Sequence, residues 1–373
     1  MFCGQCGANN PPDNRFCSGC GKELAVAQAL PAAPAVTPQA VFNSVVERLR
    51  TLASTEKLEG FSLKEMFSEV FRKRSEEQID EYFIAGTLRT TPAIDDVETG
   101  WPKPWFFMRV LGFIGVIYFG FSYAVQQFQN SNLIPGLIMM GSLAVPLATV
   151  ILFFELNTPR NVSFHRVLML VCLGGIVSLT ISLAGFSVAS LDWLGASAAG
   201  IVEETGKLLA VVLVVRGNRY RYILNGLLFG AAVGAGFAIF ESAGYAFRAL
   251  LDNRSLDAMT TNIQFRAMLS PSGHVAWTAI SAAALWRARQ GQPLKLQHFL
   301  DPTFLKAFCI PVGLHMIWNA PLPSPFFLRH LALGALGWFV VFGLVQQGLR
   351  QVRTEQREVA ATKLGTMRLV AAP

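Results

Sequence analysis

The run EETGK at residues 203–207 lies inside an apolar stretch that extends roughly from residue 195 to residue 215. This stretch has about the 20 residues that an α-helix needs to cross a bilayer. Each charged side chain at the centre of such a helix costs roughly 2.5–3.5 kcal/mol on insertion scales. We therefore expect Glu203, Glu204 and Lys207 to face a protein interior or a wet cavity, where an intramembrane charge indicates function. A structural ion pair between Glu203 and Lys207, four residues apart on one helix, is the simplest alternative.

The composition is that of a polytopic membrane protein. Hydrophobic residues form 52% of the 373 residues and charged residues only 15%, against about 25% in soluble domains. The formal net charge is +7, but the basic residues are scattered among loops beside apolar stretches, so we expect no nucleic-acid partner. The first 24 residues are polar and rich in cysteine, so we expect no signal peptide and a cytoplasmic N-terminus.

Eight apolar segments predict an all-α membrane protein with about eight transmembrane helices. They run approximately over residues 105–125, 134–154, 166–186, 195–215, 222–247, 272–287, 303–320 and 325–346. The sixth is short enough to be tilted or re-entrant. The long outer segment between the fifth and sixth holds three basic residues, Arg248, Arg254 and Arg266. The predicted cytoplasmic loops and tail hold Arg160, Arg216, Arg219, Arg221, Arg289, Lys295, Arg350, Arg353, Arg357, Lys363 and Arg368. This bias predicts a multi-pass membrane protein with both termini in the cytoplasm.

Residues 1–24 contain four cysteines in the spacing C-x2-C-x10-C-x2-C: Cys3, Cys6, Cys17 and Cys20. Four thiolates at this spacing suit a tetrahedral zinc ion, and the segment resembles the short zinc ribbons of bacterial membrane proteins. Two disulfides are the alternative, but they are disfavoured in the cytosol. Four protein ligands leave no open position, so we expect a structural zinc, and the ribbon is a candidate binding surface for a cytoplasmic protein.

The rest of the chain divides by composition. We predict an Ala/Pro linker at 25–40, a cytoplasmic helical juxtamembrane region at 41–104, a transmembrane domain at 105–346 and a basic cytoplasmic tail at 347–373. In the juxtamembrane region, capping boxes begin at Ser62 and Ser75, and an apolar stripe continues from Leu63 to Phe71. A helical spacer is the simplest interpretation of this region.

Four of the apolar segments carry polar residues that a membrane helix does not need. They are Glu203, Glu204, Lys207, Glu241, His274, His315 and Asn319. At about 1.5 Å per residue, Glu203 lies roughly 12 Å from the outer end of its segment and His315 about 18 Å from the inner end of its own. The side chains can therefore meet in the outer half of the membrane. Gly226, Gly230 and Gly234 are spaced for close helix packing on the face that carries Glu241.

This set of residue types suits the activation of water. A carboxylate enclosed by apolar helices can act as a general base, and a histidine or Asn319 can donate a hydrogen bond to an oxyanion. Alternatively, His274, His315 and a glutamate can hold a divalent metal with an open position. Two rival functions remain. A proton-coupled transporter would use a similar set, although no internal repeat is visible, and a non-catalytic adaptor would use the ribbon alone.

At these positions the chain resembles the PrsW family of intramembrane proteases, which are related to the type II CAAX prenyl proteases and to bacteriocin-processing enzymes. The resemblance rests on E-E-x-x-K at 203–207, F-x-x-x-E at 237–241, His274 and H-x-x-x-N at 315–319, and it covers roughly residues 105–346. It implies an endopeptidase that cleaves membrane-anchored substrates, such as anti-sigma factors, near the outer face. It also implies a catalytic set of Glu203, Glu204, Glu241, His274 and His315.

The CAAX branch fits less well, because it has an arginine where Leu208 stands and a histidine where Glu241 stands. This difference argues against prenyl-protein processing. For the predicted peptidase, we expect Glu203 or Glu204 to activate water while Lys207 stabilises the other carboxylate. We expect Glu241 to orient a histidine or to complete a metal site.

Overall fold

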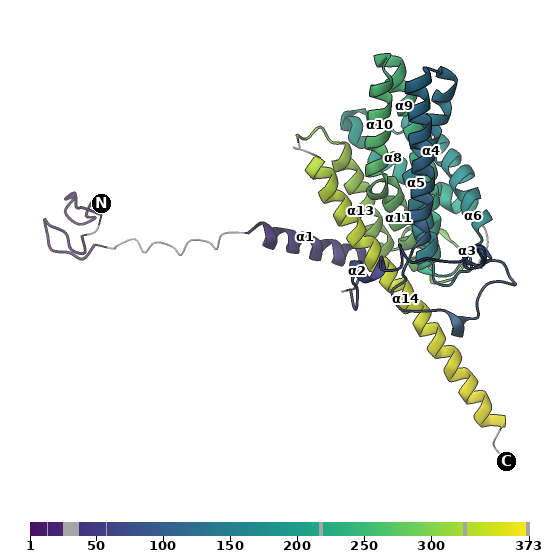
Figure 1. Cartoon of the computed structure of the whole chain (residues 1–373). Helices are drawn as coiled ribbons and strands as arrows, with labels where there is room; N and C mark the ends of the chain where they lie inside the picture. The colour runs from purple at the N-terminus through teal and green to yellow at the C-terminus, as the bar shows by residue number, and fades with distance from the viewer. Residues whose placement is uncertain (13, 25–36, 57, 216–218, 324–326, 371–373) are drawn as a thin grey trace. The chain divides into compact units, whose positions relative to one another are not determined.

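The computed structural model describes residues 1–12, 14–24, 37–56, 58–215, 219–323 and 327–370 (Figure 1). Part of the predicted linker, residues 25–36, and the predicted loop residue Arg216 lie outside the described residues. The chain divides into two compact units, Met1–Val45 and Val46–Pro373. Among the described residues the structure is helical, apart from two isolated β-bridges in the first unit.

The first unit contains two similar knuckles. The bridges Phe2–Asn9 and Phe16–Glu23 each close a short turn around one pair of cysteines. Gly7 and Gly21 both adopt φ +71°, a left-handed conformation that favours glycine. This turn brings the backbone amides of the knuckles round toward the thiols, so the glycines serve the same purpose in each half.

The juxtamembrane region forms short elements: α1 (Pro38–Ala53), α2 (Leu63–Met66), α3 (Glu76–Phe83) and η1 (Ile94–Asp96). Ser62 caps α2 by accepting from the Glu65 amide, and Ser75 forms a complete capping box with Gln78. The apolar stripe predicted as far as Phe71 does not form one helix. α2 is a single turn, after which the chain turns away and leaves Phe71 92% exposed.

The helices of the membrane region follow in this order: α4 (Phe106–Phe128), η2 (Ser131–Leu133), α5 (Ile134–Leu156), α6 (Phe164–Met169), the π-turn η3 (Leu170–Gly174), α7 (Gly175–Val188), η4 (Asp192–Ser197), α8 (Ala198–Val214), α9 (Ile223–Asn253), α10 (Leu256–Leu269), η5 (Ser270–Ser272), α11 (His274–Arg289), α12 (Leu296–Phe299), α13 (Pro302–Asn319) and α14 (Leu328–Val370). Each of the eight predicted apolar segments therefore corresponds to a helix or a run of consecutive helices.

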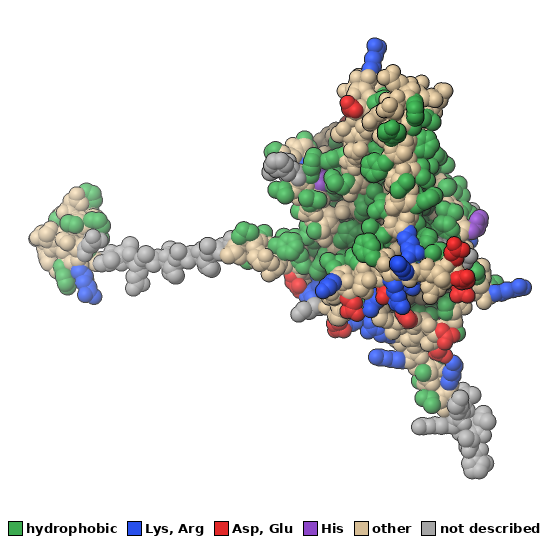
Figure 2. Space-filling view, in the orientation of Figure 1, with side chains coloured by type: hydrophobic (Ala, Val, Ile, Leu, Met, Phe, Trp, Pro, Cys, Tyr) green, Lys and Arg blue, Asp and Glu red, His purple; other side chains and the backbone are tan. Residues whose placement is uncertain are grey.

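Five of these stretches are long and apolar enough to cross a membrane: Phe106–Phe128, Ser131–Leu156, Phe164–Val188, Ile223–Asn253 and Leu328–Leu364. The other three, α8, α11 and α13, have 17, 16 and 18 residues. The chain is thus a multi-pass membrane protein, and the count of eight spans stays a prediction. Figure 2 shows hydrophobic side chains along the flank of the bundle and charged side chains gathered around its lower end, beside α14.

Two parts of the structure differ from the sequence-based expectation. The outer segment predicted as a loop contains the 14-residue helix α10, which begins where the Ser255 hydroxyl accepts from the Ala258 amide. The residues predicted as a tail continue α14 as far as Val370. Side chains of this extension bind the juxtamembrane region, since Gln356 donates to the carbonyls of Ile94 and Val97 at 2.8 Å.

The core lies between α9 and α11. A Cβ atom built on Gly230 would lie 2.2 Å from the carbonyl oxygen of Thr278, and one built on Gly234 would lie 2.3 Å from that of His274. Only glycine lets the two backbones approach so closely. The predicted role of these glycines in packing is therefore confirmed. Gly234 also stands two helical turns before Glu241, so this contact fixes the distance between Glu241 and His274.

Candidate active site

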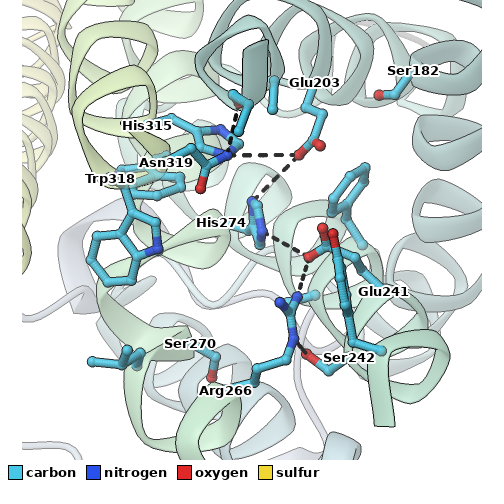
Figure 3. A pocket seen from close by; sticks show the side chains of 18 of the residues that line it. Ser182, Glu203, Glu241, Ser242, Arg266, Ser270, His274, His315, Trp318 and Asn319 are labelled. Carbon is cyan, nitrogen blue, oxygen red and sulfur yellow. Dashed lines mark hydrogen bonds and ion pairs between the residues drawn. The ribbon is translucent and has the colours of Figure 1, made fainter. Parts of the chain in front are cut away.

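A cavity of about 520 Å³ opens beside the EETGK run (Figure 3). Its lining comes from α7, η4, α8, α9, α10, η5, α11, α13 and α14. Five of the predicted site residues line it: Glu203, Glu241, His274, His315 and Asn319. Glu204 and Lys207 lie directly behind them and are fully buried. Segments more than 100 residues apart in the sequence thus supply one polar cluster.

Lys207 sits at the centre of this cluster. Its Nζ lies 2.7 Å from Glu204 Oε1 and 3.5 Å from Glu203 Oε2. It also donates to His274 Nδ1 at 2.7 Å and lies 4.3 Å from the centroid of the Phe237 ring. Of the two glutamates, Glu204 is therefore the main partner of Lys207. The ring of Phe237, from the F-x-x-x-E run, helps to hold this ammonium in place.

The hydrogen-bond partners of the two histidines indicate which ring nitrogen of each carries the proton. An ammonium only donates, so His274 Nδ1 accepts from Lys207 and His274 Nε2 donates to Glu241 Oε2 at 3.0 Å. His315 Nδ1 donates to Glu204 Oε1 at 2.9 Å, which leaves His315 Nε2 as an acceptor. Asn319 Nδ2 donates to that nitrogen at 3.2 Å and to the Ala196 carbonyl at 3.3 Å. Each histidine is thus oriented by its own carboxylate.

The acceptor nitrogens of both histidines lie near the same carboxylate oxygen. Glu203 Oε2 is 4.0 Å from His274 Nδ1 and 3.9 Å from His315 Nε2. Within the described part of the chain this oxygen is buried and has no hydrogen-bond partner. Glu155 provides a contrast, since its carboxylate accepts from three backbone amides at the start of α4 and from the Tyr82 hydroxyl. Glu155 is a satisfied structural cap, whereas Glu203 keeps an oxygen for a ligand.

The ligand atoms of Glu203, His274 and His315 all lie within 4.8 Å of one another. One carboxylate and two imidazoles, each imidazole held by a further carboxylate, are the usual donors and supports of a catalytic divalent metal. Glu203 Oε2, which accepts no hydrogen bond from the described residues, is a further sign that a cation fits between them. In the first unit, Cys3, Cys6, Cys17 and Cys20 form a second such group, in which the four thiols lie within the same distance.

Three residues of the site were not predicted. Arg266, on α10, forms an ion pair with Glu241, and its Nε donates to Ser242 Oγ at 3.0 Å. Trp277 stacks on His315 with ring centroids 4.5 Å apart. His330 lines the cavity from α14. Arg266 alone had a signal in the sequence, because it is one of three basic residues in a segment assigned to the outer face.

The comparisons with known proteins agree with this geometry. Residues 162–346 match the model of the PrsW family intramembrane metalloprotease, and residues 2–24 match a zinc-ribbon domain. The first match begins after α4 and α5, so these two helices lie outside it, whereas every member of the polar cluster lies within it. No curated protein and no solved structure shows significant similarity to the chain. The chain therefore carries a PrsW-family intramembrane protease domain, a peptidase, together with an N-terminal zinc ribbon.

Proposed function

We propose that the protein is an endopeptidase that hydrolyses membrane-anchored proteins within the cavity beside Glu203. One observation carries this proposal. Within the part of the chain that the structure describes, Glu203 Oε2 accepts no hydrogen bond and faces the acceptor nitrogens of His274 and His315, and a carboxylate, Glu241 or Glu204, binds the far side of each ring. A merely structural ion pair between Glu203 and Lys207 needs neither two oriented histidines nor a carboxylate oxygen that lacks a hydrogen bond.

The proposed roles follow from these contacts. Glu203 lines the cavity and accepts the proton of the attacking water, whose oxygen bonds to the carbonyl carbon of the substrate. The proton then passes to the leaving nitrogen as the peptide C–N bond breaks. Asn319 lines the same cavity, and its amide can donate to the developing oxyanion by giving up its 3.3 Å hydrogen bond to the Ala196 carbonyl. Lys207 offsets the charge of Glu204, and Glu204 and Glu241 keep the two rings in position.

Glu203, His274 and His315 are also the residues that would hold a divalent cation. Such an ion, when bound, polarises the substrate carbonyl and lowers the pKa of water. A carboxylate that binds a cation through one oxygen keeps the other for the proton. Lys207 donates to His274 Nδ1 and Asn319 donates to His315 Nε2, so both hydrogen bonds would have to be released before these nitrogens could bind the cation.

We infer the side of the membrane at which cleavage occurs from the position of Glu203 in its helix. Glu203 is the sixth residue of α8, which we orient with its start toward the outer face. We infer cleavage near the outer side, with both termini in the cytoplasm of a bacterial plasma membrane. Regulated proteolysis of anti-sigma-factor-like proteins is the substrate class that we propose. We further propose that the ribbon binds a cytoplasmic protein.

The test compares the parent with Glu203→Gln and with the surface variant Asp252→Asn, each expressed at the same level with a panel of tagged single-span membrane proteins. We expect a fragment with the parent and Asp252→Asn, and none with Glu203→Gln. The same fragments from all three would contradict the proposal. If no fragment appears from any of them while all are folded, and pH-driven uptake into vesicles is seen, the transporter interpretation would replace it.

A further inference from the structure

The rim of the cavity is formed by side chains that face outward. Leu183 is 68% exposed, Tyr245 45% and Phe186 43%, yet all three line the cavity. A residue that both lines a cavity and faces outward marks an opening. Leu183 and Phe186 belong to α7 and Tyr245 to α9, so this opening lies between the two helices.

The positions of these residues along their helices place the opening on the side of the bundle. Leu183 lies in the candidate span Phe164–Val188, and Tyr245 lies in the candidate span Ile223–Asn253. Leu183 is five residues from the end of α7, which corresponds to about 7 Å along the helix. The rim is therefore on the flank of two candidate membrane helices, and its aliphatic and aromatic side chains are of the kind that contact lipid.

Beyond this rim, the lining of the cavity contains polar side-chain atoms that make no hydrogen bond among the described residues. Three hydroxyls of α7 donate to carbonyls of their own helix: Ser178, Thr180 and Ser187. The fourth, Ser182, is buried, lines the cavity and has no hydrogen-bond partner within the described residues. Figure 3 shows Ser182 on the opposite side of Glu203 from the histidines. The indole nitrogen of Trp277, in the same lining, is likewise buried and unpartnered among the described atoms.

Such groups fit an extended backbone better than a helix. A helical segment satisfies its own N–H and C=O groups, but a segment unwound for hydrolysis must find partners in the cavity. Ser182 Oγ can donate to a carbonyl or accept from an amide, and Trp277 Nε1 can donate to a carbonyl. Both atoms are buried, so they can serve an unwound strand only after the side chains around them shift.

We propose that a membrane-spanning substrate enters this cavity sideways from the bilayer, between α7 and α9, and unwinds against Ser182. This inference rests on the proposed peptidase function and adds the entry route and the class of substrate segment. The occupant is an apolar transmembrane segment that can unwind locally, rather than a soluble loop that arrives from the water.

The test places a bulky side chain on the rim. Leu183→Trp is compared with Ile176→Trp, which alters a residue of α7 that is 52% exposed and does not line the cavity. Two probes are used: the single-span protein identified as a substrate of the parent, and a short soluble peptide that covers its cleavage site. We expect Leu183→Trp to slow cleavage of the single-span protein about tenfold and to leave the peptide within about twofold. Ile176→Trp should leave both unchanged.

The outcomes are distinguishable. Equal loss with both probes would mean that Leu183 shapes the cavity rather than its entrance, and unchanged cleavage of the single-span protein would also overturn lateral entry while leaving the peptidase function intact. No cleavage by the parent would remove both proposals. As a second measurement, a photoreactive benzoylphenylalanine at position 183 or 176 in the Glu203→Gln variant should crosslink substrate at position 183 alone. Crosslinks to lipid alone at position 183 would overturn the route.

Discussion

The ribbon and the membrane cavity are two groups of metal-ligand atoms with different designs. The ribbon brings together four thiols from a stretch of 18 residues, Cys3 to Cys20, and the cavity brings together one carboxylate and two imidazoles from residues 203 to 315. Four protein ligands close a tetrahedral site, whereas three leave a position open for water or substrate. The difference indicates that the first group is structural and that the second is suited to catalysis.

The two groups also differ in how they are held. Each cysteine pair is positioned by a turn of its own knuckle, with Gly7 and Gly21 at φ +71°. The histidines of the cavity are positioned by Glu204 and Glu241, and Glu241 is bound in turn by Arg266. The cavity, whose polar cluster comes from five helices, therefore depends on contacts between side chains of different helices, whereas the ribbon depends on its own turns. Four predictions test this contrast, beginning with the largest expected effect.

Metal removal should affect the cavity most. If a divalent ion serves there, treatment with a strong chelator should lower the rate of substrate cleavage by about a hundredfold or more, because the ion contributes several kcal/mol to the transition state. Adding back zinc should restore the rate, as measured by fragment formation in detergent. Full activity after complete metal removal, verified by elemental analysis, would assign Glu203 the role of a general base without a metal.

The next effect concerns Arg266. Removing its positive charge with Arg266→Gln leaves Glu241 without its arginine partner, so Glu241 is less firmly placed to orient His274 Nε2. Loss of such a supporting residue typically costs about 10–100-fold in activity or metal affinity, and we expect this loss in kcat with partial recovery in Arg266→Lys. Arg248→Gln, which alters an exposed pair with Asp252, is the matched control. Equal activity of the glutamine variants would show that Glu241 does not need Arg266.

Packing comes third. Gly234→Ala places a Cβ atom against the His274 carbonyl oxygen, at 2.3 Å before relaxation, whereas Gly244 on the same helix has no atom within 4 Å of such a Cβ. We expect Gly234→Ala to lower the free energy of unfolding by roughly 1–3 kcal/mol and Gly244→Ala to leave it nearly unchanged. Thermal unfolding of both variants in detergent measures this. Equal stability would contradict the close packing of α9 on α11.

The smallest effect is expected from the ribbon. Cys17→Ser removes one thiolate and should release the ribbon zinc, which elemental analysis of the purified protein detects. Because the ribbon belongs to the unit Met1–Val45 and the cavity to Val46–Pro373, cleavage in detergent should stay within about twofold of the parent. A large loss would show that the ribbon contributes to catalysis. This variant is also the control for the chelation experiment, since it separates the two metals.

The features that could be predicted from the sequence are those that depend on short residue patterns. Cysteine spacing identified the ribbon, capping residues marked α3, and charged residues in apolar runs identified Glu203, Glu204 and Lys207. Gly230 and Gly234 were predicted to pack, and they do. The sequence did not predict α10, and therefore not Arg266, because a helix of mixed polarity outside the apolar spans carries no periodic signal. Trp277 was missed for a different reason, since an aromatic residue in an apolar segment looks like core until its stacking on His315 is seen.

The account depends most directly on whether Glu203 is required for hydrolysis. The purified full-length parent and Glu203→Gln are reconstituted in liposomes with a single-span substrate, in water enriched in ¹⁸O, and the products are analysed by mass spectrometry. We predict that the parent yields a cut within or beside the membrane segment, with ¹⁸O in the new carboxyl terminus, and that the folded Glu203→Gln variant yields none. The same labelled cut from both proteins would contradict the assignment of Glu203 and of the cavity around it.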